Sequence, residues 1–266
     1  MDRDARRQAQ DLPAPADLHR AERPRVRGRG SALSAGPGCY TTARVERGRV
    51  ICLARHVRRL RRDAAALGLA QPEESDCERT LAEAAAAFGA GDGIVRLEWR
   101  GSRLVGRPRA LGEEPETWSA VLASTLHPGR SVTAGVKGID LPHVARARDE
   151  ARAAGADEAI LLDAQGRVVE GARTNLVIAL ADGAVVTPPL ARGAVAGLAR
   201  EIVLEGARSI READLGRDEI LAAREVVATN AVRGARPIVA IDGAELGDGR
   251  AGPLARRVAE LLANAE

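Results

Sequence analysis

The second half of the sequence restricts the fold most, because short apolar segments alternate there with turn residues. Glu158–Asp163 and Arg167–Glu170 flank Gln165-Gly166, a pattern that predicts a β-hairpin. Asn175–Leu180 and Ala184–Thr187 predict a second hairpin across residues 181–183. Strands this short need helices or another sheet to cover their faces, so a mixed fold is expected.

Apolar residues at helical spacing, with Pro or Gly near the ends of the segment, predict the helices that would cover these strands. It predicts helices over residues 142–154, 197–207 and 253–264 in the second half. Strands are predicted over 131–136 and 225–229, with a loop over 230–237. In the first half, the same reasoning predicts strands over 39–45, 49–53 and 94–99 and helices over 55–67 and 76–88.

We therefore predict an α/β (α+β) fold of two domains. Residues 1–30, rich in Arg, Asp and Pro, are expected to be a disordered arm. Residues 31–106 would form a small α/β domain, and 107–116, rich in Pro, Gly and Glu, a linker. Residues 117–266 would form the second domain.

Composition narrows the class of protein. Aromatic residues make up only 2% of the chain, so the core must consist mainly of Ala, Val, Leu and Ile. Arginines are interleaved with acids and the net charge is only +3, which fits a solvated surface or an anionic small ligand better than nucleic acid. Cys39, Cys52 and Cys77 show no metal-binding spacing, so no metal is predicted, and reduced thiols indicate a cytoplasmic protein. No apolar run is long enough for a membrane span.

Lys137 is the only lysine among the 40 lysine and arginine residues. Arginine cannot lose its proton in a protein, whereas a lysine amine can act as a nucleophile or a base. A retained lysine suggests an imine with a carbonyl compound or with pyridoxal phosphate (PLP). The alternative is that a bias toward arginine removed all other lysines by chance, so the rest of the chain has to decide.

Two more features fit a phosphorylated, imine-forming cofactor. Residues 193–200, GAVAGLAR, lead into a predicted helix whose N-terminal N–H groups would attract phosphate. Glu170 ends a predicted strand, and a carboxylate there could face a pyridine nitrogen. Taken singly, small residues before a helix are common, and a glutamate at a strand end is usually solvated.

The segments EAILLDAQGRVVEGARTNLVIALADGAVVTPPL, GAVAGLAREIVLE and EVVATNAVRGARPI resemble, in order and spacing, the C-terminal domain of fold-type IV (class IV aminotransferase) PLP enzymes. This family includes branched-chain and D-amino-acid aminotransferases and 4-amino-4-deoxychorismate lyase. GCYTTARVERGRV and RHVRRLRRDAAALG resemble its first domain more loosely. The resemblance implies a two-domain fold, PLP as cofactor in the domain over 117–266, and a homodimer.

The resemblance also implies roles for individual residues. Lys137 would be the Schiff-base lysine and move the substrate proton, and Glu170 would pair with the pyridine nitrogen. The remaining cofactor contacts would be Arg59 on the phosphate, Asn175 in the turn after the glutamate, the backbone of Gly197, Leu198 and Ala199, and Thr229 with Asn230. Tyr40 and Arg100 would face the substrate. For Arg100 the reason is that its guanidinium can form two hydrogen bonds with a carboxylate.

The chain departs from the family pattern in places that concern the substrate. Thr41 stands where an acidic residue is usual, and Asp140 where an asparagine is usual. The run from Thr229 to Gly234 resembles the lyase loop more than the transaminase loop, which favours release of pyruvate and 4-aminobenzoate for folate synthesis. An amino acid aminotransferase of branched-chain or D-amino-acid type is the alternative. A non-catalytic nucleic-acid-binding or scaffold protein is a third reading, which the mixed charges disfavour.

Overall fold

The computed structural model describes residues 37–131 and 134–265. A first sheet of four strands has the order β2-β1-β3-β4. All its pairs are antiparallel. Its strands are β1 (Cys39–Glu46), β2 (Arg49–Val50), β3 (Gly93–Trp99) and β4 (Leu104–Arg109).

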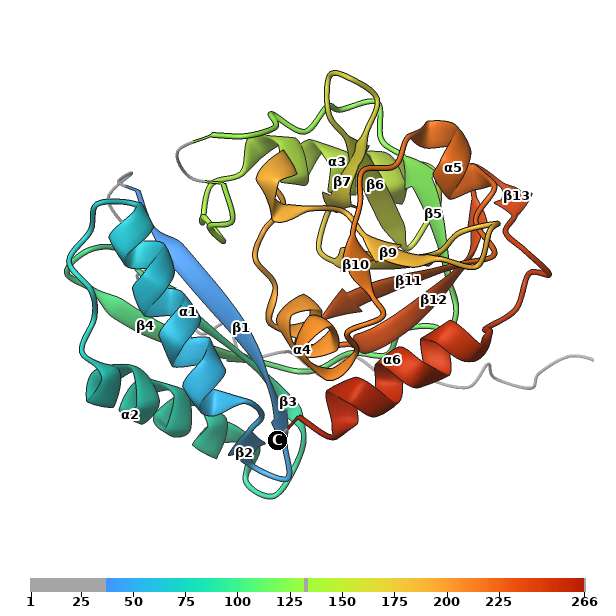
Figure 1. Ribbon diagram of the computed structural model, residues 1–266. Helices are drawn as coiled ribbons and strands as arrows, with labels where there is room; N and C mark the ends of the chain where they lie inside the picture. The colour runs from blue at the N-terminus through green and yellow to red at the C-terminus, as the bar shows by residue number, and fades with distance from the viewer. Residues whose placement is uncertain (1–36, 132–133, 266) are drawn as a thin grey trace, which may run out of the picture. The chain divides into compact units, whose positions relative to one another are not determined.

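The two faces of the first sheet differ, because strand residues alternate between them. Cys39, Ala43 and Val45 are fully buried in a core formed with α1 (Leu53–Ala66) and α2 (Glu74–Ala85). Both helices contact this sheet and each other (Figure 1). The opposite face, which carries Tyr40, is therefore available for a site.

The second sheet has nine strands, in the order β10-β9-β8-β11-β12-β5-β6-β7, with β13 paired to β12. Its pairs are mixed: β5 runs parallel to β6 and β12, while the β6–β7 and β8–β9 pairs are hairpins. The strands are β5 (Trp118–Leu122), β6 (Glu158–Leu162), β7 (Val168–Gly171), β8 (Asn175–Ala179), β9 (Val185–Thr187), β10 (Arg211–Glu212), β11 (Glu225–Asn230), β12 (Gly234–Ile241) and β13 (Ala244–Glu245).

Helices cover the second sheet, which explains why β6, β7 and β8 are buried along their whole length. In β8, Leu176 and Ile178 belong to one apolar cluster and Val177 to another. The helices are α3 (Pro142–Ala153), α4 (Leu198–Gly206), α5 (Arg217–Leu221) and α6 (Pro253–Ala263). Of these, α3 packs on β5 and β6, while α4 and α6 pack on each other and on β11 (Figure 1). Within the described ranges, no helix combines the length and the apolar character that crossing a membrane requires.

The predicted mixed α/β fold is confirmed, and four details are corrected. Residues 107–109 of the predicted linker belong to β4 and pair with β3, so only 110–117 lack helix and strand. The predicted strand 49–53 ends at Val50, because Leu53 begins α1. The loop predicted over 230–237 is a short turn followed by β12. The two-domain division stays a prediction, since residues 36–266 group as one unit. The predicted arm, residues 1–30, lies outside the described residues.

The fourth correction concerns the segment before Lys137. Described residues 131 and 134–136 form no strand; Ala134 and Gly135 lie in a turn, and Gly135 has φ of 86°. Just after Lys137, an isolated bridge pairs Gly138 with Cys39 of β1. Lys137 therefore reaches the site from a loop fastened to the first sheet.

Trp118 is the largest fully buried side chain, and its removal is the largest loss of stability that we expect from the core. Trp118→Ala should lower the free energy of unfolding by about 3–5 kcal/mol, measured by chemical denaturation. Trp118→Phe should cost much less, because the indole Nε1 is buried without a hydrogen-bond partner. Leu126→Ala, at a 55% exposed position, is the control. Equal losses for Trp118→Ala and Leu126→Ala would contradict this account.

Candidate active site

A cavity of about 260 Å³ lies against residues from both sheets and holds most of the predicted site. Nine predicted residues line it: Tyr40, Arg59, Lys137, Glu170, Asn175, Gly197, Leu198, Thr229 and Asn230. These residues come from β1, α1, β7, β8, α4 and β11 and from the loops before α3 and α4. The fold thus brings together residues up to 190 positions apart in sequence.

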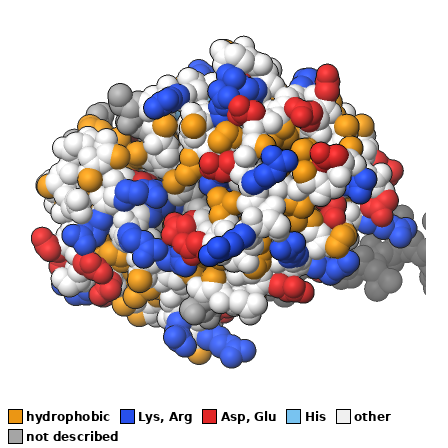
Figure 2. Space-filling model, in the orientation of Figure 1, with side chains coloured by type: hydrophobic (Ala, Val, Ile, Leu, Met, Phe, Trp, Pro, Cys, Tyr) orange, Lys and Arg blue, Asp and Glu red, His pale blue; other side chains and the backbone are white. Residues whose placement is uncertain are grey.

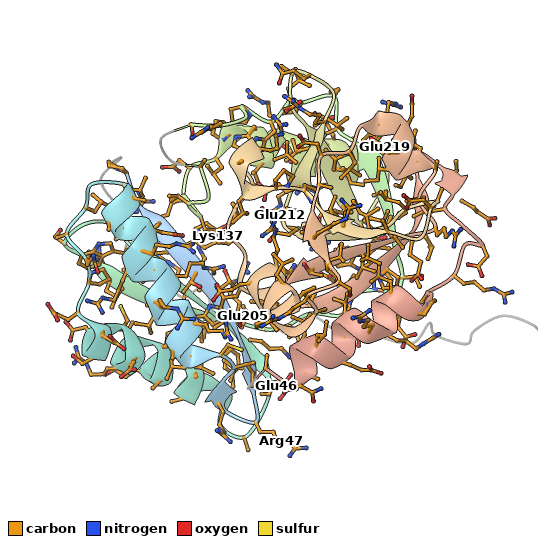
Figure 3. All side chains as sticks on the ribbon, in the orientation of Figure 1. Glu46, Arg47, Lys137, Glu205, Glu212 and Glu219 are labelled. Atoms are coloured by element: carbon orange, nitrogen blue, oxygen red, sulfur yellow. The ribbon has the colours of Figure 1, made fainter. Side chains whose placement is uncertain are left out.

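Lys137 is held in place through its backbone, so its amine is not needed to fix the loop. Its N–H donates to the buried carboxylate of Asp63 at 3.0 Å, and its carbonyl accepts from the N–H of Tyr40 at 3.0 Å. The Nζ atom lies 4.9 Å from the centroid of the Tyr40 ring. Figure 3 labels Lys137 on the ribbon. Asp63 is therefore a positioning residue that sequence reasoning missed, since only the tertiary structure brings α1 to this loop.

Tyr40 and Arg96 form a stacked pair on the open face of the first sheet. The Arg96 guanidinium lies 3.6 Å from the Tyr40 ring centroid, and its Nε donates to Glu98 at 2.6 Å. Burial opposes ionisation of the Tyr40 phenol, but the positive charges of Lys137 and Arg96 outweigh it, so the pKa of Tyr40 lies below its usual value. The pair offers a phenol and a cation to an anionic group near Lys137.

Arg96, and not Arg100, is the arginine of β3 that lines the cavity. Arg96 pairs with Thr42, so it points to the same face as Tyr40. Arg100 follows the end of β3, where its N–H donates to the carbonyl of Arg103 in the turn to β4. The predicted contact of Arg100 with substrate is thus not supported within this chain. The register between β1 and β3 would have pointed to Arg96.

Glu170 is 3% exposed and its carboxylate is held on one side by defined donors. Oε2 accepts from the Val195 N–H at 2.9 Å and lies 3.5 Å from the Asn175 amide nitrogen. Asn175 also donates to the Val195 carbonyl at 2.9 Å. Asn175 therefore connects the glutamate to the loop before α4, while its predicted role in the turn after the glutamate stays a prediction.

The first turn of α4 leaves backbone N–H groups without a side-chain cap. Gly197 immediately precedes this turn. A Cβ atom on Gly197 would lie 2.1 Å from Asn175 Oδ1, so only glycine fits there. Thr229, 1% exposed, pairs with Asn175 in the sheet. Asn230 accepts from the N–H groups of the turn at residues 232 and 233.

Ala199 does not line this cavity but a neighbouring one, so its predicted cofactor contact is unsupported.

Arg59 supplies a positive charge to the part of the cavity next to the start of α4. Its side chain is buried, Nη2 donates to the Thr41 hydroxyl, and Nε has no hydrogen-bond partner. No carboxylate in the described part of the chain forms an ion pair with it. Burial lowers the pKa of Arg59 to about 10, although Asp63 opposes this. A buried guanidinium with an unsatisfied donor, beside an uncapped helix start, fits a phosphate group.

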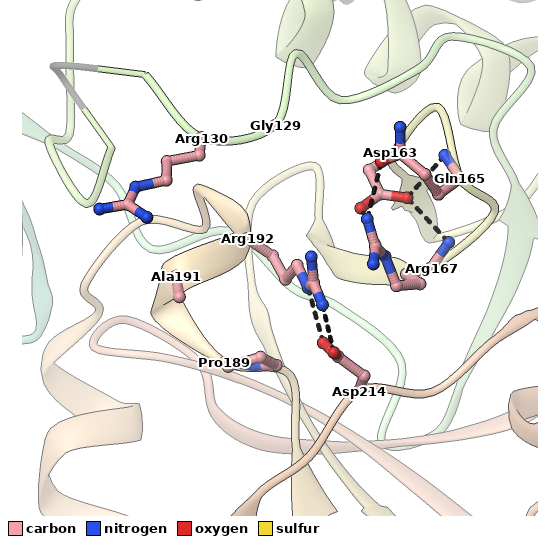
Figure 4. A pocket seen from close by; sticks show the side chains of 9 residues that line it. All are labelled: Gly129, Arg130, Asp163, Gln165, Arg167, Pro189, Ala191, Arg192 and Asp214. Carbon is pink, nitrogen blue, oxygen red and sulfur yellow. Dashed lines mark hydrogen bonds and ion pairs between the residues drawn. The ribbon is translucent and has the colours of Figure 1, made fainter.

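A second cavity, of about 390 Å³, lies at the β6–β7 hairpin but does not offer comparable chemistry (Figure 4). Four of its five charged side chains form ion pairs with each other, Arg192 with Asp214 and Arg167 with Asp163, and Arg130 belongs to neither pair. Burial opposes ionisation of Asp163, yet hydrogen bonds from Arg167 keep its pKa low. We therefore place the functional site in the cavity that Lys137 lines.

His56 makes the stability of this region depend on pH. It is fully buried, its Nδ1 lies 2.6 Å from the Thr41 hydroxyl, and burial holds its pKa well below 6.5. The unfolded chain takes up a proton on His56 below about pH 6.5, whereas the folded protein does not. The free energy of unfolding should therefore fall as the pH is lowered, by about 2 kcal/mol between pH 6.5 and 5.

Chemical denaturation at several pH values tests this, with His56→Asn as the comparison. The variant should lose less stability over the same range, because it lacks the titrating ring. His143, whose pKa burial lowers to about 4, is present in both proteins and cancels from the difference. Parallel pH profiles for the two proteins would contradict the assignment.

Comparison with known proteins identifies the family of this chain. The family model for amino-transferase class IV matches residues 38–241. The branched-chain-amino-acid aminotransferase of Escherichia coli is 34% identical over 113 residues, which cover 41% of this chain and 36% of that enzyme. The D-alanine aminotransferase of Bacillus licheniformis is 28% identical over 249 residues, 86% of this chain and 87% of that enzyme.

Among solved structures, a Legionella pneumophila protein with the provisional name 4-amino-4-deoxychorismate lyase has the same fold. The TM-score is 0.78 at 20% identity, covering 87% of this chain and 92% of that one. The chain belongs to the class IV aminotransferase family, a family of PLP-dependent enzymes. This confirms the predicted family and enzyme class. The match to the branched-chain enzyme spans only about a third of that enzyme's length.

Proposed function

We propose that this protein is a PLP-dependent aminotransferase that acts on an amino acid. The observation that carries the proposal is the arrangement of three groups on one cavity: the amine-bearing Lys137, the buried carboxylate of Glu170 and the buried guanidinium of Arg59. These are the groups that a ring with an aldehyde, a basic nitrogen and a phosphate needs.

Each residue on the cavity has a proposed role toward the cofactor or the substrate. Arg59, the start of α4 and the turn after Thr229 would hold the phosphate, and Glu170 would face the ring nitrogen. Bound PLP supplies an electron sink for the substrate carbon next to the amine. Lys137 would bond the aldehyde at rest and then, once freed, move the proton at that carbon. Arg96, stacked on Tyr40, would hold a substrate carboxylate close to Lys137.

The relatives support an aminotransferase better than the lyase that the loop pattern favours. Both curated relatives described above are aminotransferases, and one of them matches over most of the chain. The lyase-like structure is only 20% identical, which supports the fold alone. The lyase remains a second candidate because of one observation, the run from Thr229 to Gly234 at the cavity wall.

A scaffold or nucleic-acid-binding role has less support. In Figure 2, basic and acidic side chains are interspersed over the visible face and form no continuous basic stripe. Nucleic-acid binding usually needs such a stripe.

One pair of assays separates the two enzymatic candidates. Holoenzyme given D- or L-amino acids with 2-oxoglutarate should form glutamate and the matching oxo acid. Given 4-amino-4-deoxychorismate without any oxo acid, it should not form pyruvate. Pyruvate release without an acceptor would establish the lyase instead, and no turnover in either assay would contradict both candidates.

A further inference from the structure

His127 faces the oxygen of Glu170 that the hydrogen bonds described above leave free. Its Nε2 lies 3.7 Å from Glu170 Oε1, while the Val195 and Asn175 donors serve Oε2. Both side chains are buried, at 5% and 3% exposure. His127 lies just after β5, far in sequence from every motif, and sequence reasoning gave it no role.

The hydrogen bonding of the His127 ring fixes where its proton lies. Nδ1 accepts from the backbone N–H of Gly129 at 3.0 Å, and an amide N–H can only donate. Nδ1 therefore carries no proton, so the neutral imidazole carries it on Nε2. The ring presents an N–H, without a net charge, to the carboxylate. At 3.7 Å this is an electrostatic contact rather than a hydrogen bond.

The position of the His127 ring is also fixed by packing. Its backbone N–H donates to the Leu162 carbonyl at 2.8 Å, at the end of β6. His143 packs edge-on against it, with ring centroids 4.9 Å apart. On another side, a Cβ atom on Gly193 would lie 2.9 Å from His127 Cε1, so the loop before α4 closes over the ring. These contacts leave the imidazole little freedom to turn away from Glu170.

We propose that His127 is a positioning residue that keeps the Glu170 carboxylate aimed at the cofactor's ring nitrogen. This inference rests on the proposed PLP-binding function. A cationic partner would compete with the ring nitrogen for the carboxylate charge, whereas a neutral N–H stabilises that charge and leaves it available. His127 thereby sets how firmly Glu170 holds the protonated ring nitrogen, without touching the substrate.

The test uses the full-length chain and three variants: His127→Ala, His127→Gln, which retains an N–H donor, and Arg130→Ala on the same loop as the control. Equilibrium dialysis measures PLP affinity, and the visible spectrum of the holoprotein reports on the ring. His127→Ala should bind PLP about 10- to 100-fold more weakly and shift the absorption band. His127→Gln should recover most of both properties, and Arg130→Ala should match the unmodified protein.

Three results would be decisive against parts of this account. Wild-type affinity and spectrum in His127→Ala would overturn the role of His127 while leaving the proposed function intact. Equal losses of PLP affinity in His127→Ala and His127→Gln would show that His127 acts only by packing, which would also overturn its proposed positioning role. Failure of the unmodified protein to bind PLP would instead refute the proposed function.

Discussion

Replacing Lys137 by alanine is expected to lower kcat by at least about 10³-fold and to leave the fold intact. The chemistry needs the amine, but the structure does not, because the loop is held by the backbone of Lys137 through Asp63 and Tyr40. Circular dichroism and thermal melting should therefore match the unmodified protein, while aminotransferase assays of the PLP-loaded variant should show almost no turnover.

Lys137→Arg separates charge from reactivity. The guanidinium would retain a positive charge near the Tyr40 ring, but it cannot lose its proton to act as nucleophile or base. It should therefore be as inactive as the alanine variant. More than a tenth of the normal kcat in Lys137→Arg would mean that the cation, and not the free amine, matters at this position.

Glu170→Gln is expected to produce the other large loss, a fall in kcat of roughly 100- to 4,000-fold. This follows from the 3–5 kcal/mol that removal of one partner from a buried charge pair costs, at 1.4 kcal/mol per tenfold in rate. The amide has nearly the same shape as the carboxylate, so the loss would come from the charge and not from packing. Steady-state kinetics with a saturating amino donor measures it.

Glu158→Gln is a matched control for this variant. Glu158 is also buried, in the neighbouring strand, where it accepts from the Thr174 hydroxyl at 2.8 Å, but it does not line the cavity. Burial raises its pKa, so an uncharged side chain is tolerated there. We expect a kcat within about threefold of normal. Equal effects of the two substitutions would show that Glu170 has no special role.

The sequence predicted the parts of the fold that local patterns determine. The hairpins β6–β7 and β8–β9 follow from short apolar segments separated by turn residues, and the starts of α3 and α6 follow from Pro142 and Pro253. The strand predicted before Lys137 was wrong, because Ala134 and Gly135 form a turn in which Gly135 has φ of 86°, a left-handed conformation that does not continue a strand. β5 went unrecognised, although Trp118 is central to the core.

In the candidate site too, local motifs identified some residues, while others became visible only in the structure. Lys137, Glu170 and Arg59 stand in recognisable motifs and meet in one cavity. Arg96, Asp63 and His127 were missed because their importance depends on register and on loop packing. The contact of Arg100 with substrate stays a prediction, and only the pairing of β1 with β3 identifies Arg96 as an arginine on the face of Tyr40. The predicted homodimer and cytoplasmic location stay predictions.

Borohydride reduction of the PLP-loaded protein, followed by peptide mass spectrometry, tests the central claim most directly. Because Lys137 is the only lysine, a single peptide can carry a pyridoxyl group on a side-chain amine. We predict that the peptide containing Lys137 gains that mass and that the protein retains its absorbance after dialysis. Tightly bound PLP that leaves the Lys137 peptide unmodified would contradict the assignment of this amine.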